Sequence, residues 1–259
     1  MSNKNPIGLF DSGIGGTSIW REIHSLLPFE NTIYLADSKN APYGVKSKDE
    51  IIQLSIKNTE FLLNKNCKLI VVACNTATTN AIKELREKYN FPFIGIEPAI
   101  KPAANKTNTH TIGILATKGT LNSELFHNNV ANFSEVKIIE QVGHGLVQLI
   151  ENGDINSSEM TLLLKSYIEP MLDQNIDYLV LGCSHYPYLI PQLKKIIPPH
   201  VKIIDSGEAV AKQTQNILNQ YKLNNNSKAE SYNHFYTNSN SKVLKAILKN
   251  SYTVYEKDF

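Results

Sequence analysis

The chain has 259 residues, of which 42% are hydrophobic and 19% charged, values typical of a globular protein that folds without a disulfide or a metal. Its formal net charge of +2, from 26 Lys and Arg against 24 Asp and Glu, gives no electrostatic reason to expect a nucleic-acid or anionic-membrane partner. The length fits one large domain or two of ordinary size.

From the N-terminus, a polar segment leads into a short apolar run that lacks the length of a signal-peptide core. Short apolar runs then alternate with amphipathic stretches, a pattern typical of βαβ units with a parallel sheet. The expected strands are residues 7–10, 32–36, 69–73, 93–96, 111–115, 136–140, 178–182 and 201–204. The expected helices are residues 18–27, 48–65, 78–89, 145–152, 158–174 and 188–197.

The strands repeat along the chain. Residues 7–12 match residues 112–117, and three further strand pairs recur at nearly the same offset. This repeat predicts an α/β fold of two similar domains, each a mainly parallel sheet flanked by helices, related by a pseudo-two-fold repeat. We place the first domain at 1–97 plus 208–259 and the second at 98–207, with an active site in the cleft between them. A single long sheet is the alternative.

The tail is expected to pack back on the first domain, since the ends of domains commonly lie close together. It contains an amphipathic segment at 208–221, a strand-like segment at 234–237 and a helix-like segment at 242–248. Between them lies an Asn-rich loop, 224–227, which we expect to be mobile and to which we assign no function.

Three cysteines are present, without the spacing of metal ligands, so we expect no metal site and free thiols in a reduced, cytoplasmic protein. No run approaches the ~20 apolar residues of a membrane span, so we expect no membrane partner. Cys74 and Cys183 each follow a strand of buried type and precede a helix, whereas Cys67 has no such context.

The carboxyl edge of a parallel sheet is where open α/β folds bind ligands. A thiol beside a helix N-terminus is favoured as thiolate, so we expect a lowered pKa at Cys74 and Cys183. Either cysteine alone could be a small core residue. Their matching placement favours two acid/base groups that face one substrate.

Charged and polar neighbours accompany the two thiols. His185 can exchange a proton with Cys183, and Asp11, at the end of the first strand, can take the proton of Cys74. The glycines in Asp11-Ser12-Gly13-Ile14-Gly15-Gly16 let backbone N–H groups approach an anionic ligand, although such a segment also makes a good structural turn. Neutral polar groups near the same edge are Asn75, Thr76, Thr120, Ser184 and the turn Pro42-Tyr43-Gly44.

Together these motifs resemble the glutamate racemases of the aspartate/glutamate racemase superfamily, in order and spacing across essentially the whole chain. The matching segments are Asp11-Ser12-Gly13-x-Gly15-Gly16, Pro42-Tyr43-Gly44, Cys74-Asn75-Thr76-Ala77 and Gly182-Cys183-Ser184-His185-Tyr186-Pro187. The family usually has Thr where this chain has Ser184. The resemblance implies a cofactor-independent, PLP-free isomerase that interconverts L- and D-glutamate, supplies D-glutamate for peptidoglycan, and forms a homodimer.

The resemblance also implies a role for each site residue. Asp11 assists Cys74, which handles the proton of the D-enantiomer. His185, oriented by Glu151, assists Cys183, which handles that of the L-enantiomer. Without the resemblance, Glu151 is a solvated helix carboxylate. The substrate-binding residues implied are Asp11, Ser12, Pro42, Tyr43, Gly44, Asn75, Thr76, Thr120, Ser184 and His185.

The chemistry of racemisation agrees with two thiols. A proton leaves one face of Cα and another arrives at the opposite face, so one base must start as thiolate and the other as thiol. Without PLP, the carbanion depends on the retained ammonium group and on donors aimed at the α-carboxylate. The alternatives are an aspartate or hydantoin racemase, a two-lobed amino-acid-binding protein that needs neither cysteine, and a thiol redox protein.

Overall fold

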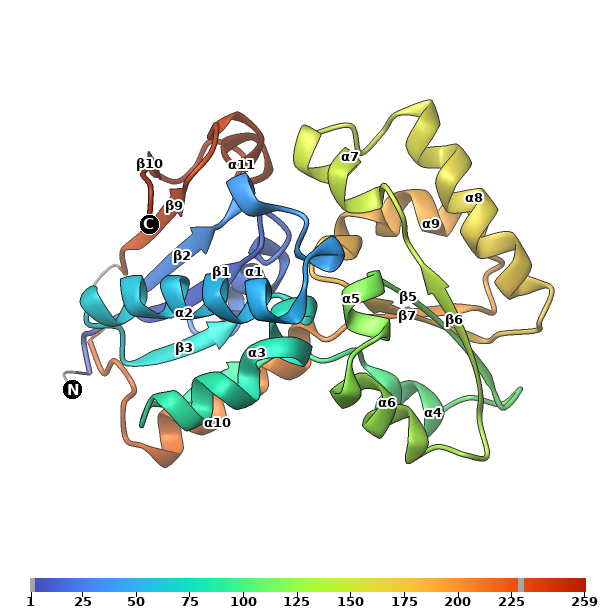
Figure 1. Cartoon of the computed structure of the whole chain (residues 1–259), viewed down its shortest axis with the longest axis horizontal. Coiled ribbons are helices and arrows are strands. Elements are labelled where there is room, and N and C mark those ends of the chain that lie inside the picture. Colours follow the sequence, from blue (N-terminus) through green and yellow to red (C-terminus); the bar gives the residue numbers. More distant parts are fainter. Residues whose placement is uncertain (1–2, 228–230) are drawn as a thin grey trace.

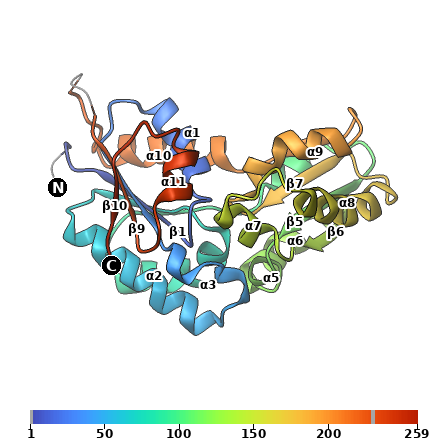
Figure 2. The same cartoon turned by 90° about the horizontal axis from the view of Figure 1, so that it is seen from above.

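Two parallel sheets organise the described residues, 3–227 and 231–259, of the computed structural model. The sheets lie in two halves placed side by side (Figure 1), and helices flank both sheets (Figure 2). The expected α/β fold class is confirmed. No helix in the described part of the chain has the length and hydropathy needed to cross a membrane.

The first sheet has the strand order β10-β9-β2-β1-β3-β4 and the second has the order β6-β5-β7-β8. The strands of the first sheet are β1 (Ile7–Asp11), β2 (Thr32–Ala36), β3 (Leu69–Val72), β4 (Phe93–Gly95), β9 (Asn233–Thr237) and β10 (Val254–Glu256). Those of the second are β5 (Thr111–Ala116), β6 (Lys137–Val142), β7 (Tyr178–Gly182) and β8 (Lys202–Ile204).

The longer helices agree with the amphipathic pattern, whereas several short ones were not expected. The helices are α1 (Thr17–Leu26), α2 (Lys48–Asn64), α3 (Asn75–Lys88), α4 (Ile100–Ala104), α5 (Lys118–Leu121), α6 (Glu124–Ala131), α7 (Leu146–Asn152), α8 (Ser158–Leu172), α9 (Ile190–Ile196), α10 (Gly207–Gln220) and α11 (Lys242–Ile247). The described residues also form the 3₁₀ turns η1 (Ser38–Asn40), η2 (Tyr43–Val45) and η3 (Tyr186–Leu189). Helices α4 and α5 and strand β10 are too short to give a periodic signal, and α6 buries only Phe126.

The strand order repeats between the halves. In the first sheet β1 lies between β2 and β3, and in the second β5 lies between β6 and β7. On one side of the central strands the registers correspond, because Ile7 pairs with Leu69 and Ile112 pairs with Tyr178. On the other side Ile7 pairs with Thr32 and Ile112 pairs with Ile138, two residues beyond the Val136 that the sequence repeat aligns with Thr32. After the second sheet the chain returns to the first, where β9 pairs with β2 and α10 packs against α1. The domain limits at residues 97 and 208 stay a prediction.

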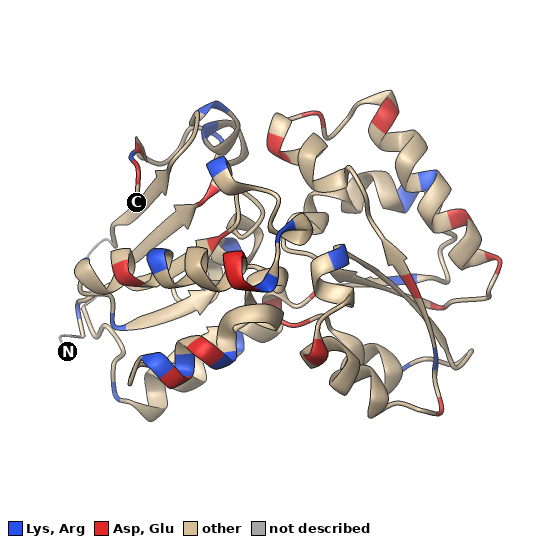
Figure 3. Ribbon diagram, viewed as in Figure 1, with Lys and Arg blue, Asp and Glu red and all other residues tan. Residues whose placement is uncertain are grey.

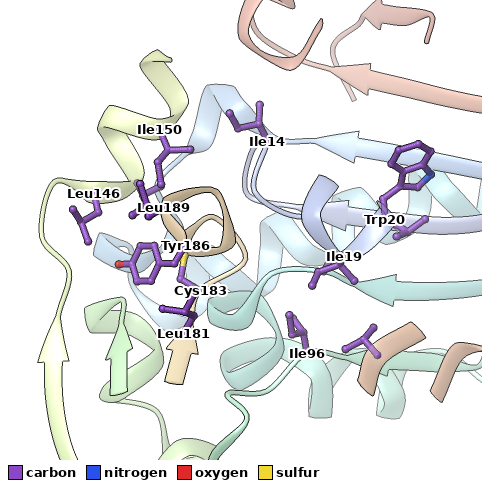
Figure 4. Close-up of a cluster of buried hydrophobic side chains, with 14 of the residues drawn as sticks. Ile14, Ile19, Trp20, Ile96, Leu146, Ile150, Leu181, Cys183, Tyr186 and Leu189 are labelled. Carbon is purple, nitrogen blue, oxygen red and sulfur yellow. The ribbon is translucent and has the colours of Figure 1, made fainter. Parts of the chain in front are cut away.

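Apolar packing joins the halves beside one of the two candidate thiols. One buried cluster contains Ile14 from the first half and Ile150, Leu189 and Cys183 from the second (Figure 4). Strands β1 and β7 are buried along their whole length, which explains why their sequences are almost continuously apolar rather than alternating. The two sheets therefore hold their carboxyl edges against each other through a shared core.

A buried ion pair lies at the edge of the first sheet where β2 and β3 begin, opposite the candidate thiols. The Lys68 ammonium lies 2.5 Å from Glu30 Oε2 and donates to the Asn3 carbonyl at 2.7 Å, and both charged side chains are almost fully buried. Glu30 Oε1 accepts the backbone N–H of Asn225 at 2.7 Å, and the Asn225 side chain donates to the Phe29 carbonyl. The Asn-rich loop is therefore anchored to the first half through Asn225, and its mobility stays a prediction.

Candidate active site

The carboxyl ends of the central strands of both sheets meet around one small cavity of about 10 Å³, the room of a single water molecule. Asp11 ends β1, Cys74 follows β3 and Cys183 follows β7. The cavity is lined by Ser12, Pro42, Tyr43, Gly44, Cys74, Asn75, Thr76, Thr117, Val147, Cys183, Ser184 and His185. Three further predicted residues, Asp11, Thr120 and Glu151, are hydrogen-bonded to lining residues.

Cys74 begins helix α3 with its own side chain. Its Sγ accepts the backbone N–H of Ala77 at 3.4 Å and donates to Ser12 Oγ at 3.7 Å. The helix therefore starts at Asn75, three residues before the predicted start, because the thiol itself serves as N-cap. The polar residues directly after Cys74 therefore form the first turn of α3.

The pKa of Cys74 is raised, whereas the sequence predicted a lowered value. Burial raises the pKa of this thiol well above its usual range, and the Asp11 carboxylate and Cys183 add to the rise. The hydrogen bonds with Ala77 and Ser12 act in the opposite direction but do not compensate. The predicted lowering considered the helix N-terminus and omitted desolvation, which is the larger effect in a closed cavity. Cys74 is therefore a neutral thiol in this structure.

Cys183 lies at one end of a relay of ionisable groups. His185 Nδ1 is 3.8 Å from Cys183 Sγ, and on the other side of the ring Nε2 is 2.5 Å from Glu151 Oε1. Burial by itself lowers the pKa of His185, but the interactions with Cys183, Glu151 and Asp11 raise it well above its usual value. These interactions therefore favour the imidazolium form of His185, whose ring lies against the Cys183 side chain.

His185 and Glu151 of the second half contact the glycine-rich loop that follows β1 in the first half. Glu151 Oε1 accepts the Ile14 N–H at 2.7 Å, and Glu151 Oε2 accepts the Ser38 hydroxyl at 3.0 Å. A Cβ atom at Gly13 would lie 2.0 Å from Glu151 Oε1, and one at Gly15 would lie 2.2 Å from His185 Nδ1. The loop was expected to approach an anionic ligand, whereas here its N–H groups bind carboxylates of the protein itself.

Asp11 is fully buried and faces the second half. Its Oδ2 accepts the N–H groups of Gly13 and Gly16 at 3.1 and 3.0 Å, and its Oδ1 accepts the Ser184 hydroxyl at 3.0 Å. Burial raises the pKa of Asp11, although His185 and these hydrogen bonds oppose the rise. No hydrogen bond joins Asp11 to Cys74 within residues 3–227 and 231–259, so a proton transfer between them stays a prediction.

The polar wall of the cavity contains an amide with no partner in the described part of the chain. Asn75 is 3% exposed, and neither its Oδ1 nor its Nδ2 atom has a hydrogen-bond partner there. A buried polar group left in this state costs about 1–3 kcal/mol. Such a group is retained readily where a ligand supplies the missing partners.

Beside Asn75, three hydroxyls form a cluster across the two halves. Thr76 lies 2.8 Å from Thr117 Oγ1, and Thr117 lies 3.0 Å from Thr120 Oγ1. Thr117 was not predicted as a site residue, although the repeat pairs it with Ser12 and so contained the signal. Val147, which also lines the cavity, gave no signal in the sequence. In the turn before α2, the Tyr43 hydroxyl is hydrogen-bonded to Asp37 and Asn58 and is not free to bind a ligand.

No group of three or more His, Cys, Asp or Glu side chains in the described ranges is arranged to hold a metal ion. The arrangement instead provides two thiols, each with its own polar surroundings, on one enclosed cavity. Such an arrangement can remove a proton from one side of a bound carbon atom and deliver one from the other side.

Known proteins resemble the chain over nearly its full length. The family model for Asp/Glu/hydantoin racemase matches residues 7–214. A glutamate racemase from Ectopseudomonas mendocina is 47% identical over 223 residues, 85% of each chain. A solved Escherichia coli glutamate racemase, in complex with L-glutamate and the activator UDP-MurNAc-ala, is 34% identical with a TM-score of 0.87 over 98% of both chains. A Francisella tularensis glutamate racemase in complex with D-glutamate is 29% identical with a TM-score of 0.85, over 99% of this chain and 98% of that one.

Proposed function

The chain belongs to the Asp/Glu/hydantoin racemase family, among its glutamate racemases, and we propose that it interconverts L- and D-glutamate with Cys74 and Cys183 as the two bases. The observation that carries the proposal is the placement of both thiols on one cavity, each at the end of a corresponding strand of the repeat. An aspartate or hydantoin racemase is not favoured by the relatives, which are glutamate racemases at 44–47% identity.

The raised pKa of Cys74 suits a proton donor in the reaction from L- to D-glutamate. The Cys183 thiolate, beside the His185 imidazolium, removes the Cα proton from one face of L-glutamate. The neutral Cys74 thiol delivers its own proton to the opposite face, which leaves Cys74 as thiolate and Cys183 as thiol. The reverse reaction starts from that second state. The ammonium group of the substrate, bonded to the Cα between the thiols, brings a positive charge that opposes the rise in the pKa of Cys74 caused by burial.

Polar groups in the wall of the cavity can support the carbanion. The unpaired amide of Asn75 and the hydroxyls of Thr76 and Thr117 supply donors for the substrate carboxylates. Donors that are already oriented stabilise developing charge more strongly in an enclosed site than in water. We propose that Ser12, Ser184 and the backbone of Gly44 complete the substrate site, with Pro42, Tyr43 and Thr120 behind them.

Glutamate requires the cavity to open. A volume of about 10 Å³ is far below the roughly 300–1,000 Å³ of ligand pockets. Contacts that span the halves join Ile14 to Glu151 and the Ser18 hydroxyl to the Ser184 carbonyl, so they break when the halves separate. Closure then excludes water and brings Glu151 and His185 against the glycine loop in one movement.

We extend the proposal to the cellular setting implied by the family resemblance. D-glutamate is supplied for peptidoglycan, the enzyme needs no PLP or other cofactor, and it acts in the cytoplasm as a homodimer. Its working parts are a first domain, 1–97 plus 208–259, and a second domain, 98–207, that close on the substrate. Sedimentation of the purified protein tests the homodimer.

Hydrogen exchange at Cα tests the activity directly. In D₂O without added PLP, we expect the protein to incorporate deuterium at Cα of both L- and D-glutamate, and neither aspartate nor glutamine to exchange at a comparable rate. The measurement is the loss of the Cα proton signal by NMR. Folded protein with intact thiols that exchanges neither enantiomer would contradict the racemase proposal, and tight glutamate binding without exchange would identify a binding protein.

Changing Glu151 to Gln tests the relay to Cys183. The substitution removes the charge that helps to raise the pKa of His185, so the imidazolium deprotonates at lower pH. We expect kcat to fall by about 10–100-fold, as for other residues that orient a catalytic histidine. The alkaline limb of the pH–kcat profile should also shift to lower pH. Glu169→Gln, the same chemical change at an exposed position of α8, should leave both unchanged. A Glu151→Gln profile that coincides with wild type contradicts the relay.

A further inference from the structure

A second, larger recess lies directly outside the catalytic cavity. It has a volume of about 500 Å³ and runs between the start of α2 in the first half and α5 in the second. Four basic or titratable side chains line it: Lys46 and Lys48 from the first half and Lys118 and His144 from the second. No Asp or Glu of the described chain lines this recess, which we call the lysine groove.

The wall between the lysine groove and the cavity is one residue thick. Gly44 lines both spaces, and Gly119 of the second half lies against it. A Cβ atom at Gly119 would lie 3.2 Å from Gly44 Cα, and one at Gly44 would lie 2.8 Å from Thr117 Cβ. The two backbones therefore touch where the two halves meet. We call this contact the Gly44–Gly119 seam; a separation of the halves along it would join the cavity to the groove.

Positive charge in the groove is only partly neutralised. Lys48 lies 3.4 Å from Glu84 Oε1, and the charge of Lys46 acts on Glu50, whose carboxylate caps α2 through Ser47. Neither Lys46 nor Lys118 forms an ion pair within 4 Å in the part of the chain that is described. Figure 3 shows lysine positions at the start of α5 and just before α2 on facing sides of the gap between the halves.

On the basis of the proposed function, we propose that the lysine groove is an encounter site that captures glutamate through Lys46 and Lys118 before it passes the Gly44–Gly119 seam. Glutamate carries two carboxylates and one ammonium group, so its net charge is negative at neutral pH. Fixed positive charge around a narrow entrance raises the local concentration of an anionic substrate and its association rate. Because the two lysines belong to different halves, they flank the entrance from both sides when it opens.

The test is a double variant, Lys46→Gln with Lys118→Gln, assayed with both enantiomers at low and high salt. We expect kcat/KM to fall about three- to tenfold at about 10 mM salt, and less than twofold at about 0.5 M salt, where the screening length is a few ångströms. We expect kcat to be unchanged, since neither lysine lines the cavity. The Lys46→Arg, Lys118→Arg variant should keep the wild-type values.

Two exposed lysines on α9 give the matched control. Lys194→Gln with Lys195→Gln changes the net charge equally but lies outside the groove, so kcat/KM should stay at the wild-type value. An equal loss in this control, or a loss in kcat for the groove variant, would overturn the encounter site.

The outcomes separate the two proposals. Wild-type protein that does not racemise glutamate overturns the proposed function, and the encounter site with it. Wild-type racemisation, with an unchanged kcat/KM and salt dependence in the Lys46→Gln, Lys118→Gln variant, overturns the encounter site alone.

Discussion

Replacement of Cys74 by serine is expected to abolish net racemisation of glutamate in both directions. One of the two proton transfers then lacks a base, and a hydroxyl in a desolvated cavity is a far weaker acid than a thiol. A positioned acid/base group contributes about 10²–10⁴-fold, and we expect a loss at the upper end for Cys74→Ser and also for Cys183→Ser. The measurement is the change in optical rotation from each pure enantiomer.

Each single variant should nevertheless still remove the Cα proton from one of the two enantiomers. With a β-chloro amino acid, removal of the Cα proton leads to loss of chloride without any second proton transfer. Cys74→Ser keeps the Cys183 base and should eliminate chloride from the L-analogue only, and Cys183→Ser should do so from the D-analogue only. Equal elimination from both analogues by either variant would refute the assignment of one thiol to each face.

Cys67 provides the control for both thiol variants. It is also buried, and burial raises its pKa to about 12, but it lies against Gly8 beneath β1 and away from the cavity. Cys67→Ala should therefore racemise at a rate close to wild type. A loss of activity there comparable to that of Cys74→Ser would mean that the thiol effects report folding rather than chemistry.

The largest expected effect on stability comes from Lys68→Met. The substitution leaves the Glu30 carboxylate buried without its charged partner, and breaking one side of such a pair costs about 3–5 kcal/mol. The free energy of unfolding, measured in urea, should fall by that amount. Lys88→Met breaks the exposed pair with Glu60 and should cost less than about 1 kcal/mol. Equal losses of unfolding free energy in the two variants would show that the buried pair contributes no more to stability than the exposed one.

Much of the fold could be predicted because the central strands are buried on both faces. Their sequences are continuously apolar, and each ends in the polar residues of the sheet edge, so β1, β3, β5 and β7 are visible without any structure. The short helices α5 and α6 could not be predicted, since α5 has only four residues and α6 buries only Phe126.

The site was less predictable than the strands, for two physical reasons. Desolvation depends on how tightly the halves close, so the raised pKa of Cys74 could not be inferred from its place before a helix. Contacts between the halves are equally invisible in one sequence. Glu151 looks like a solvated helix residue until α7 is placed against the glycine loop, where it meets Ile14 and His185.

Thermodynamics limits the effect that the unequal surroundings of the two thiols can have on the reaction. L- and D-glutamate are mirror images and have the same free energy in water, so their equilibrium constant is one. The two values of kcat/KM must therefore be equal, even though Cys183 has an imidazole beside it and Cys74 a serine hydroxyl and a backbone amide. The asymmetry can redistribute kcat and KM between the two directions. It cannot favour either enantiomer, so net flux depends only on which one is consumed elsewhere.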